Sequence, residues 1–467
     1  MEVQAATGWA NRRAQGADTF ARADKPPRAP QEAYEQGYEM MAGLASDPLS
    51  SALTRGAAMT AAASTEQVPS TLSAGAPAPV FDPMASALFG SRPVATERWT
   101  FPTGDYVDSA ACAGPDGSFY VGSRDHKLYA IKDGKESWSY DAGTSIESSP
   151  CRGADGTVYV TSTDGRLHAV REGVQAWSCQ LGERLTSSPC LASDGTVVVA
   201  TRDNRICGVR DGQVSWTFST ESAFCGSPCI DAHDVVYAVS DDGVLHAVQA
   251  GKELWRFDTG SHVMNAPTVS PDGVVYVSDS DGHVQAVRDG KRMWNWEAST
   301  GKPMGSSPSL GGNGLIYVGG FDGRLYALRA DSGEEAWEFK VRPQIDDVRG
   351  RPCVGPDETV YISCGNGRLF AVRNGEAAWE MPLGSRADAG PCLGPDGTLA
   401  VGTFGHEVRA FLIADYNDPK SAARIAEEVA QRAAAAARPS PTVVDQGDWI
   451  VVDGVRLPKR PETVPVG

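Results

Sequence analysis

The ten cysteines are the residues of this 467-residue chain with the widest range of possible chemistry, because thiols form disulfides and hold soft metals. Most of these cysteines recur at one position of a repeated segment. Equivalent positions in neighbouring repeats lie farther apart than the Cα separation of about 7 Å that a disulfide tolerates. The chain has no Cys-x-x-Cys pair and its seven histidines are scattered, which argues against a metal site. We therefore expect free thiols that pack as small apolar side chains. Six of them share one position of a repeated segment, directly after a Ser-Pro or similar pair: Cys112, Cys151, Cys190, Cys229, Cys353 and Cys392.

A charged stretch over 341–352, "VRPQIDDVRGRP", is the second candidate for chemistry. Opposite charges so close in sequence either pair with one another at the surface or form a contact patch on a loop of a rigid scaffold. Both interpretations stay open at this point. The residues concerned are Arg342, Asp346, Asp347, Arg349 and Arg351.

Tryptophan marks the repeat that must position these residues. Within one period, "SSPC", "TVYVTS", "RLHAV" and "QAWSCQ" each have the character of a short strand, and Asp-Gly or Glu-Gly pairs between them favour tight hairpin turns. Four antiparallel strands in a period near 40 residues are typical of a β-propeller blade, in which the large ring packs between neighbouring sheets. The first six tryptophans are 39 residues apart and the last two follow at 43 and 42: Trp99, Trp138, Trp177, Trp216, Trp255, Trp294, Trp337 and Trp379.

The blade count follows from the offset of the strands. The Trp strand, the "SPC"-like strand and the "LHAV"-like strand each occur eight times, yet the chain enters with a lone Trp99 strand and leaves after three strands over 389–413. Pairing the first strand with the last three completes an eighth blade and removes the free sheet edges. The sequence therefore predicts an all-β fold, an eight-bladed propeller over residues 96–413, with seven blades as the alternative.

One position per blade is predicted to line a mouth of the central channel, where the chain leaves the Trp strand and enters the innermost strand. A structural residue would repeat at such a position, whereas this one varies in charge and size, which favours a role in binding. The eight residues are Asp108, Glu147, Thr186, Cys225, Met264, Gly305, Arg349 and Asp388.

The flanks differ from the ring in composition. Residues 1–95 are rich in Ala, Ser, Pro and Gly and predict a mostly disordered leader. Residues 414–438 predict a helix that begins at the Asp418-Pro419 pair. The tail over 439–467 predicts a β-hairpin that turns at Asp453-Gly454 and exposes Trp449, so it should dock either on its own propeller or on a partner.

The formal charge of −17 argues against nucleic acid and anionic membrane surfaces as partners. No stretch is long and apolar enough to insert into a membrane, and the first residues show no secretory signal or lipoprotein anchor. Many unpaired thiols suit a reducing compartment, so we expect a cytoplasmic protein, with secretion by a non-classical route as the alternative.

The segments "SSPSL…GLIYVGG" and "DGRLYAL…SGEEAWEFK", at 306–320 and 322–340, resemble the PQQ-like (pyrroloquinoline quinone) propeller repeat, and every blade from Trp99 to Ile413 matches it. This family includes quinoprotein dehydrogenases and non-catalytic propellers such as the scaffold lipoprotein of the outer-membrane β-barrel assembly machinery. The blades here have no insertions that could supply a Ca²⁺ and quinone site, and no Cys-Cys pair occurs.

The resemblance and the minimal blades favour a non-catalytic scaffold, a monomeric ring that binds protein partners and no cofactor or metal. An exported effector that binds a host protein is the first alternative, and a PQQ-dependent dehydrogenase is the second. Candidate partner-binding residues are Asp108, Glu147, Arg342, Asp346, Asp347, Arg349, Arg351, Asp388 and Trp449.

Overall fold

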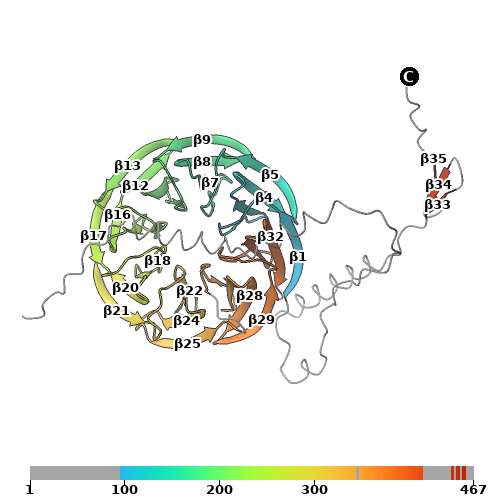
Figure 1. Ribbon diagram of the computed structural model, residues 1–467. Coiled ribbons are helices and arrows are strands. Elements are labelled where there is room, and N and C mark those ends of the chain that lie inside the picture. The colour runs from blue at the N-terminus through green and yellow to red at the C-terminus, as the bar shows by residue number, and fades with distance from the viewer. Residues whose placement is uncertain (1–94, 343–346, 414–442, 446–448, 453–454, 459–467) are drawn as a thin grey trace, which may run out of the picture. The chain divides into compact units, whose positions relative to one another are not determined.

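A computed structural model describes residues 95–342, 347–413, 443–445, 449–452 and 455–458. Residues 95–413 form a ring of eight antiparallel four-stranded sheets (Figure 1), so the predicted eight-bladed all-β propeller is confirmed. Within the described residues there is no helix. The predicted leader and the predicted helix over 414–438 lie outside them.

The first four blades follow one another in sequence order, each with a two-residue innermost strand and a long outermost strand. Blade 1 is β2 (Cys112–Ala113), β3 (Phe119–Gly122), β4 (Lys127–Lys132) and β5 (Lys135–Asp141). Blade 2 is β6 (Cys151–Arg152), β7 (Val158–Thr161), β8 (Arg166–Arg171) and β9 (Val174–Gln180). Blade 3 is β10 (Cys190–Leu191), β11 (Val197–Thr201), β12 (Arg205–Arg210) and β13 (Gln213–Ser219). Blade 4 is β14 (Cys229–Ile230), β15 (Val236–Val239), β16 (Val244–Gln249) and β17 (Lys252–Asp258).

The next three blades repeat the same order. Blade 5 is β18 (Thr268–Val269), β19 (Val275–Ser278), β20 (His283–Arg288) and β21 (Lys291–Glu297). Blade 6 is β22 (Ser309–Leu310), β23 (Leu315–Gly319), β24 (Arg324–Arg329) and β25 (Glu335–Lys340). Blade 7 is β26 (Cys353–Val354), β27 (Val360–Cys364), β28 (Arg368–Arg373) and β29 (Glu376–Pro382).

Blade 8 closes the ring with strands from both ends of the propeller. It contains β30 (Cys392–Leu393), β31 (Thr398–Thr403) and β32 (Glu407–Ile413), and its outermost strand is β1 (Ala95–Pro102). Trp99 pairs with Ala410 in the register of β1 and β32, with a bulge between Glu97 and Trp99. The closure predicted from the offset of the strands is therefore confirmed.

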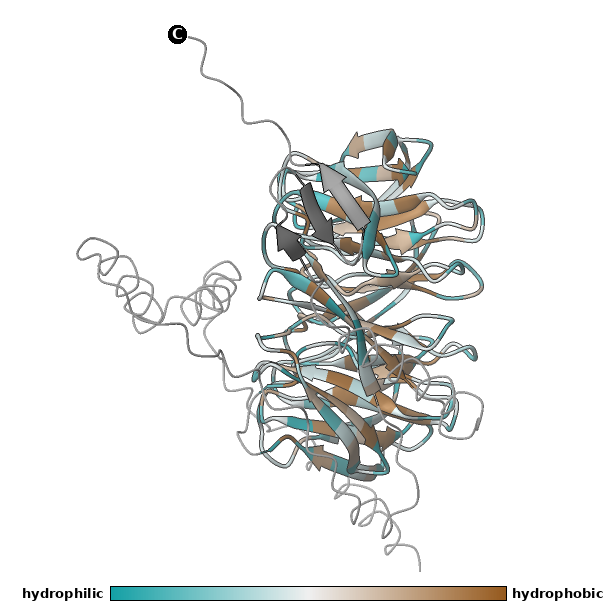
Figure 2. Ribbon diagram, turned by 90° about the vertical axis from the view of Figure 1, so that its right-hand side faces the viewer, coloured by the Kyte–Doolittle hydropathy of each residue, from teal (hydrophilic) through white to brown (hydrophobic). Residues whose placement is uncertain are grey.

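Packing between neighbouring blades forms the core. The two middle strands of each blade are buried on nearly every residue, whereas the outermost strands expose one face, as in β3 and β5. Tyr120 and Leu128 of blade 1 share one apolar cluster with Val158 and Val160 of blade 2, and Trp138 packs against that cluster. In the edge-on view of Figure 2, hydrophobic colour follows the strands and hydrophilic colour gathers in the turns.

Three further strands form a separate antiparallel sheet: β33 (Val443–Asp445), β34 (Trp449–Val452) and β35 (Val455–Pro458). β34 pairs with β35 so that Val452 lies opposite Val455. The predicted turn at Asp453-Gly454 falls between them, outside the described residues.

Candidate functional site

The mouth-lining loops are built in the same way in successive blades. A small or buried apolar residue, such as Val107 in blade 1, is flanked by two side chains at the mouth, Tyr106 before it and Asp108 after it. The amide of Arg124, in the turn between the two middle strands, donates to the carbonyl of Tyr106 at 3.0 Å. The corresponding bond joins Phe404 to Arg386 at 2.9 Å in blade 8. Each blade therefore presents three neighbouring side chains on this face.

A charged sector occupies the mouth over blades 7, 8 and 1. We define it as Asp347, Arg349, Arg386, Asp388, Asp108 and Arg124. Arg349 pairs with Asp347 and lies 4.0 Å from Asp388, while Arg386 binds Asp388 at 2.9 Å and Asp347 at 3.5 Å. The network therefore joins blades 7 and 8 across their seam.

The same alternation of charge continues around the ring. Arg124 binds Asp108 at 2.5 Å in blade 1, and Arg184 binds Glu147 at 3.4 Å between blades 2 and 3. The acids predicted to lie at the mouth thus each pair with an arginine. The arginines at positions 124, 184 and 386 did not appear among the sequence candidates.

Aromatic rings alternate with these arginines. The Arg349 guanidinium carbon lies 4.8 Å from the ring centre of Phe321, and that of Arg386 lies 5.8 Å from Phe404. Phe404 in turn stacks on Tyr106, with ring centres 5.0 Å apart and planes at 16°. Cation–π contacts and offset stacking each stabilise such arrangements. These contacts therefore restrict the side-chain conformations of Arg349 and Arg386.

Burial shifts the pKa of two acids in this sector. Desolvation raises the pKa of Asp108, and the neighbouring Arg124 opposes that rise. Desolvation likewise raises the pKa of Asp388, against the effect of Arg386 and Arg349. The charges of Glu147 and Asp388 also raise the pKa of Asp108, which agrees with acids from blades 8, 1 and 2 lying around one mouth.

Across blades 4, 5 and 6 the two positions that flank the small or buried residue contain no Asp, Glu, Lys or Arg, whereas the third position of blade 4 is Asp241. We call this the neutral sector; it contains Ala223, Cys225, His262, Met264, Pro303 and Gly305. Met264 is 40% exposed, although apolar side chains are usually covered. The mouth therefore carries a network of ion pairs over blades 7, 8 and 1 and few charges over blades 4, 5 and 6.

The structure separates the charged stretch of blade 7 into two environments. Asp347 and Arg349 join the charged sector, and Arg342 is exposed to solvent. Arg351 lies in the second environment, away from the charged sector. Its Nε donates to Ser309 Oγ at 3.2 Å and its Nη2 donates to Thr268 Oγ1 at 3.4 Å. These hydroxyls belong to the innermost strands of blades 6 and 5. Asp346 lies outside the described residues, and Trp449 begins β34, away from the mouth loops in sequence.

None of the ten cysteines forms a disulfide. The six repeat-equivalent thiols begin the innermost strands of their blades. Five of them pack against inter-blade clusters: Cys112, Cys190, Cys229, Cys353 and Cys392. They are half-buried rather than fully buried because this edge of each blade faces the central channel. Burial raises the pKa of Cys112 and Cys353, so both are neutral thiols near pH 7.

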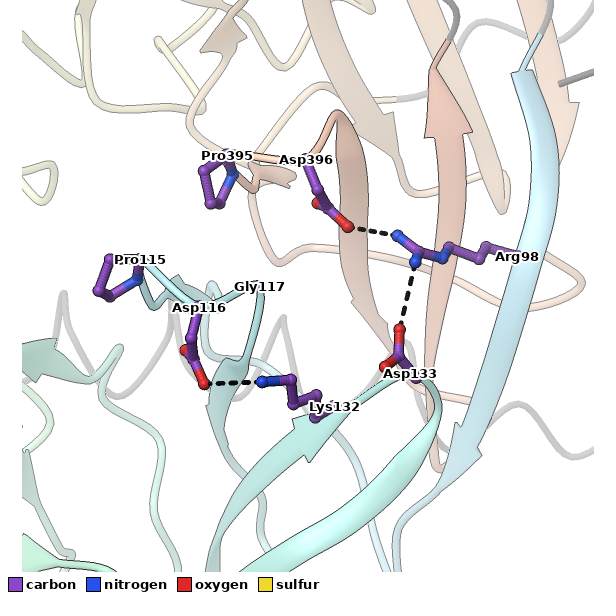
Figure 3. Close-up of a pocket in the computed structure, with 8 residues that line it drawn as sticks. All are labelled: Arg98, Pro115, Asp116, Gly117, Lys132, Asp133, Pro395 and Asp396. Atoms are coloured by element: carbon purple, nitrogen blue, oxygen red, sulfur yellow. Dashed lines mark hydrogen bonds and ion pairs between the residues drawn. The ribbon is translucent and has the colours of Figure 1, made fainter. Parts of the chain in front are cut away.

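A pocket on the opposite face lies at the seam between blades 8 and 1 (Figure 3). Arg98 of β1 reaches Asp396 of blade 8 and Asp133 of blade 1, the latter at 3.2 Å. Lys132 binds Asp116 at 3.1 Å beside it. The charges that line this pocket satisfy one another, so the contacts fasten the seam.

The mouth residues do not fit a calcium-dependent quinone. A Ca²⁺ ion takes six to eight oxygen ligands, largely carboxylates. Asp108, Glu147 and Asp388 are each paired with an arginine, and those guanidinium groups would repel a second cation. Within the described ranges no group of three or more His, Cys, Asp or Glu side chains is arranged to hold a metal ion.

No helix in the described part of the chain is long and apolar enough to cross a membrane.

Comparison with known proteins gives one family. The profile described as "Outer membrane protein assembly factor BamB" matches residues 92–217 and 209–403. No curated protein matches the chain by sequence. The crystal structure of BamB from Moraxella catarrhalis is similar at a TM-score of 0.58 and 17% identity, over 68% of this chain and 100% of that one. The computationally designed protein Ika8 is similar at a TM-score of 0.60 and 13% identity, over 68% of this chain and 99% of that one.

Proposed function

Because the chain belongs to the PQQ-like propeller family described as outer membrane protein assembly factor BamB, we propose that it is a non-catalytic, protein-binding scaffold. In this proposal a partner protein docks on the mouth formed by the charged and neutral sectors. The ring supplies rigidity, and the variable loop residues supply recognition.

One observation carries the proposal: side-chain identity varies at the mouth and repeats on the opposite face. Eight equivalent mouth positions include acids, a basic residue, a methionine and a glycine. The turns on the opposite face repeat an aspartate that accepts a hydrogen bond from a hydroxyl two residues later, as Asp155 does from Thr157 and Asp396 does from Thr398. Folding accounts for a repeated turn, whereas it does not require seven residue types at eight equivalent mouth positions.

The chemistry of the mouth also suits a protein partner. Arginine and aromatic residues are enriched where binding energy concentrates in interfaces, and here Arg349, Arg386 and Phe404 are half-buried in a fixed arrangement. The exposed Met264 adds a flexible apolar contact on the other side. We propose that a partner places apolar side chains over the neutral sector and polar groups over the charged one.

We also propose that the protein works in the cytoplasm as a monomeric ring, in keeping with ten cysteines and no disulfide. If it is exported instead, its partner would be a host protein.

Photo-crosslinking in the native cells tests the docking site. A benzophenone amino acid would replace Met264 at the mouth and, in a matched control, Met293 on the outer strand β21, which is 45% exposed. We expect a defined protein adduct from position 264 and none from position 293. The same adduct from both positions, or adducts from position 293 alone, would contradict docking at the mouth. The identity of the adduct distinguishes a cytoplasmic partner from a host protein.

A further inference from the structure

Arg351 is an exception among the residues that face the central channel. It occupies the position two residues before the first innermost-strand residue Cys353, where every other blade has a small side chain. The equivalents in the other seven blades are Ala110, Ser149, Ser188, Ser227, Ala266, Ser307 and Gly390. The innermost strands of neighbouring blades lie side by side around the axis, so at this position a single long cation replaces the short side chains of the other seven blades.

Two hydroxyl groups orient this cation. Ser309 Oγ and Thr268 Oγ1 accept from Arg351 Nε and Nη2 at 3.2 and 3.4 Å. Each hydroxyl uses its own hydrogen on a backbone carbonyl, that of Pro352 or of Pro308, at 2.6 Å in both cases. The hydroxyls are therefore fixed as acceptors, and they orient the guanidinium group, whose other N–H groups have no acceptor among the described residues.

Arg351 has no carboxylate partner among the residues that the structure describes. Its side chain is exposed to channel solvent, yet the surrounding ring desolvates it enough to lower its pKa. The neighbouring thiols do not compensate the charge, because burial raises the pKa of Cys229 to about 12 and raises that of Cys353 as well. A cation with no carboxylate partner among the described residues attracts anions into the channel, and a bound anion would pair with it.

Serine hydroxyls provide further donors along the channel. Ser149 Oγ accepts the backbone N–H of Ala110 at 3.0 Å, and Ser188 Oγ accepts that of Ser149 at 2.9 Å. Ser227 and Ser307 accept a neighbouring N–H in the same way, at 2.8 and 3.0 Å. Within the described residues none of these four hydroxyls donates to a protein acceptor, so their hydrogens remain available to a ligand. All four side chains are half-exposed at the channel.

We propose that the central channel is a binding site for one small oxyanion of the phosphate or sulfate class, held by Arg351 and by hydroxyl groups of the innermost strands. The guanidinium fork matches two oxygens of such an ion, and the serine hydroxyl groups of the innermost strands supply further donors. The low-dielectric walls of the ring strengthen the attraction at the axis despite the negative net charge of the chain. This site is independent of partner docking at the mouth.

A purely mechanical role is the competing explanation, since Arg351 also ties blade 7 to blades 5 and 6. The two explanations differ in what they predict for an uncharged variant. Arg351→Gln keeps hydrogen-bond donors for Ser309 and Thr268 but removes the charge. If Arg351 only ties the blades together, Arg351→Gln should lower the melting temperature with or without phosphate. If Arg351 binds an anion, Arg351→Gln should mainly remove the rise in melting temperature that phosphate causes.

The test is titration of the full chain with inorganic phosphate at constant ionic strength, followed by calorimetry and thermal unfolding. We expect one saturable site, and a melting temperature that rises with phosphate as binding to the native state requires. Sulfate should compete, whereas acetate, a planar monocarboxylate, should bind more weakly. Arg351→Gln should weaken phosphate binding by at least about tenfold, equivalent to about 1.4 kcal/mol. The control Arg342→Gln removes the same charge from an exposed position and should bind like the original chain.

Two further variants keep the proposal falsifiable if Arg351→Gln does not fold. Arg351→Lys retains the charge without the fork and should bind phosphate measurably but more weakly. Ser188→Ala removes one hydroxyl donor and should weaken binding without abolishing it. The absence of saturable phosphate binding to the original chain, or equal binding by Arg351→Gln, would overturn the proposal.

Discussion

Arg409 Nη2 binds Glu97 Oε2 at 2.6 Å and so joins two residues that are 312 positions apart in the chain. Glu97 lies on β1, the first strand of the propeller, and Arg409 lies on β32, the last. On the face of the ring opposite the mouth, Arg98 joins the same strand to Asp396 and Asp133 (Figure 3). Ion pairs and apolar burial together keep the two ends of the ring paired.

Breaking the apolar part of this closure should open the ring. Phe101 is buried in the cluster that joins blades 8 and 1, so Phe101→Asp places a charge there and should cost at least about 3 kcal/mol. The exposed edges of an open ring favour aggregation. We expect a lower melting temperature and larger species by light scattering. The control Ser137→Asp places the same charge on the exposed outermost strand β5 of blade 1 and should stay monomeric with a nearly unchanged melting temperature; a Phe101→Asp protein that behaves like this control would contradict closure through β1.

The turn glycine of each outer hairpin contacts the tryptophan of the preceding blade. Asp133 and Gly134 both have positive φ, 49° and 74°, as a two-residue type I′ turn requires. A Cβ on Gly134 would lie 2.6 Å from Trp99 Cβ, whereas a Cβ on Gly143, at φ 82°, would meet nothing within 4 Å.

Gly134→Ala and Gly143→Ala therefore carry a similar backbone penalty of about 1–2 kcal/mol and differ in the tryptophan contact. We expect Gly134→Ala to lower the free energy of unfolding by at least about 1 kcal/mol more than Gly143→Ala, as measured by denaturant titration. Equal losses would mean that the tryptophan does not fill the inter-blade gap tightly at this point.

The charged sector should respond to pH through Asp388. Arg386→Gln removes its nearest cation, and burial already raises its pKa. An acid whose folded pKa lies above its unfolded pKa destabilises the native state above that pKa, and the loss fades as pH falls and the group is protonated. Arg386→Gln should therefore cost about 1–2 kcal/mol at pH 7 and less at pH 5.

Denaturant unfolding at the two pH values measures this difference, with the exposed Arg342→Gln as the matched loss of charge. A cost for Arg386→Gln that is the same at pH 5 and pH 7 would contradict a role for Asp388.

The ring could be predicted from the sequence because its information is periodic. A tryptophan recurs in every blade, and Asp-Gly turns separate many of the strands. The offset of the first strand predicts its pairing with the last three. Periodicity could not place Arg351, because charged residues that are close in sequence need not lie in the same environment. Arg349 lies at the mouth, and two residues later the chain has entered the wall of the channel.

Arg386 was missed for a related reason. The predicted mouth residues follow a small or apolar residue, here Ala387, and Arg386 precedes it. Its equivalents, among them Tyr106, Arg184 and Asp347, vary as much as the predicted position does. Variation at this second position was the available signal, whereas the ion pairs between blades depend on side-chain geometry that a repeat pattern does not encode.

Cofactor loading tests most directly whether this ring is a scaffold or a quinoprotein. Purified protein would be incubated with pyrroloquinoline quinone and Ca²⁺, desalted, and assayed for quinone absorbance and dye-linked alcohol oxidation, beside a PQQ dehydrogenase as a loading control. Because the mouth acids are already paired with arginines, we expect no retained quinone and no oxidation. Retention of one quinone per chain with alcohol oxidation would contradict the proposed scaffold function.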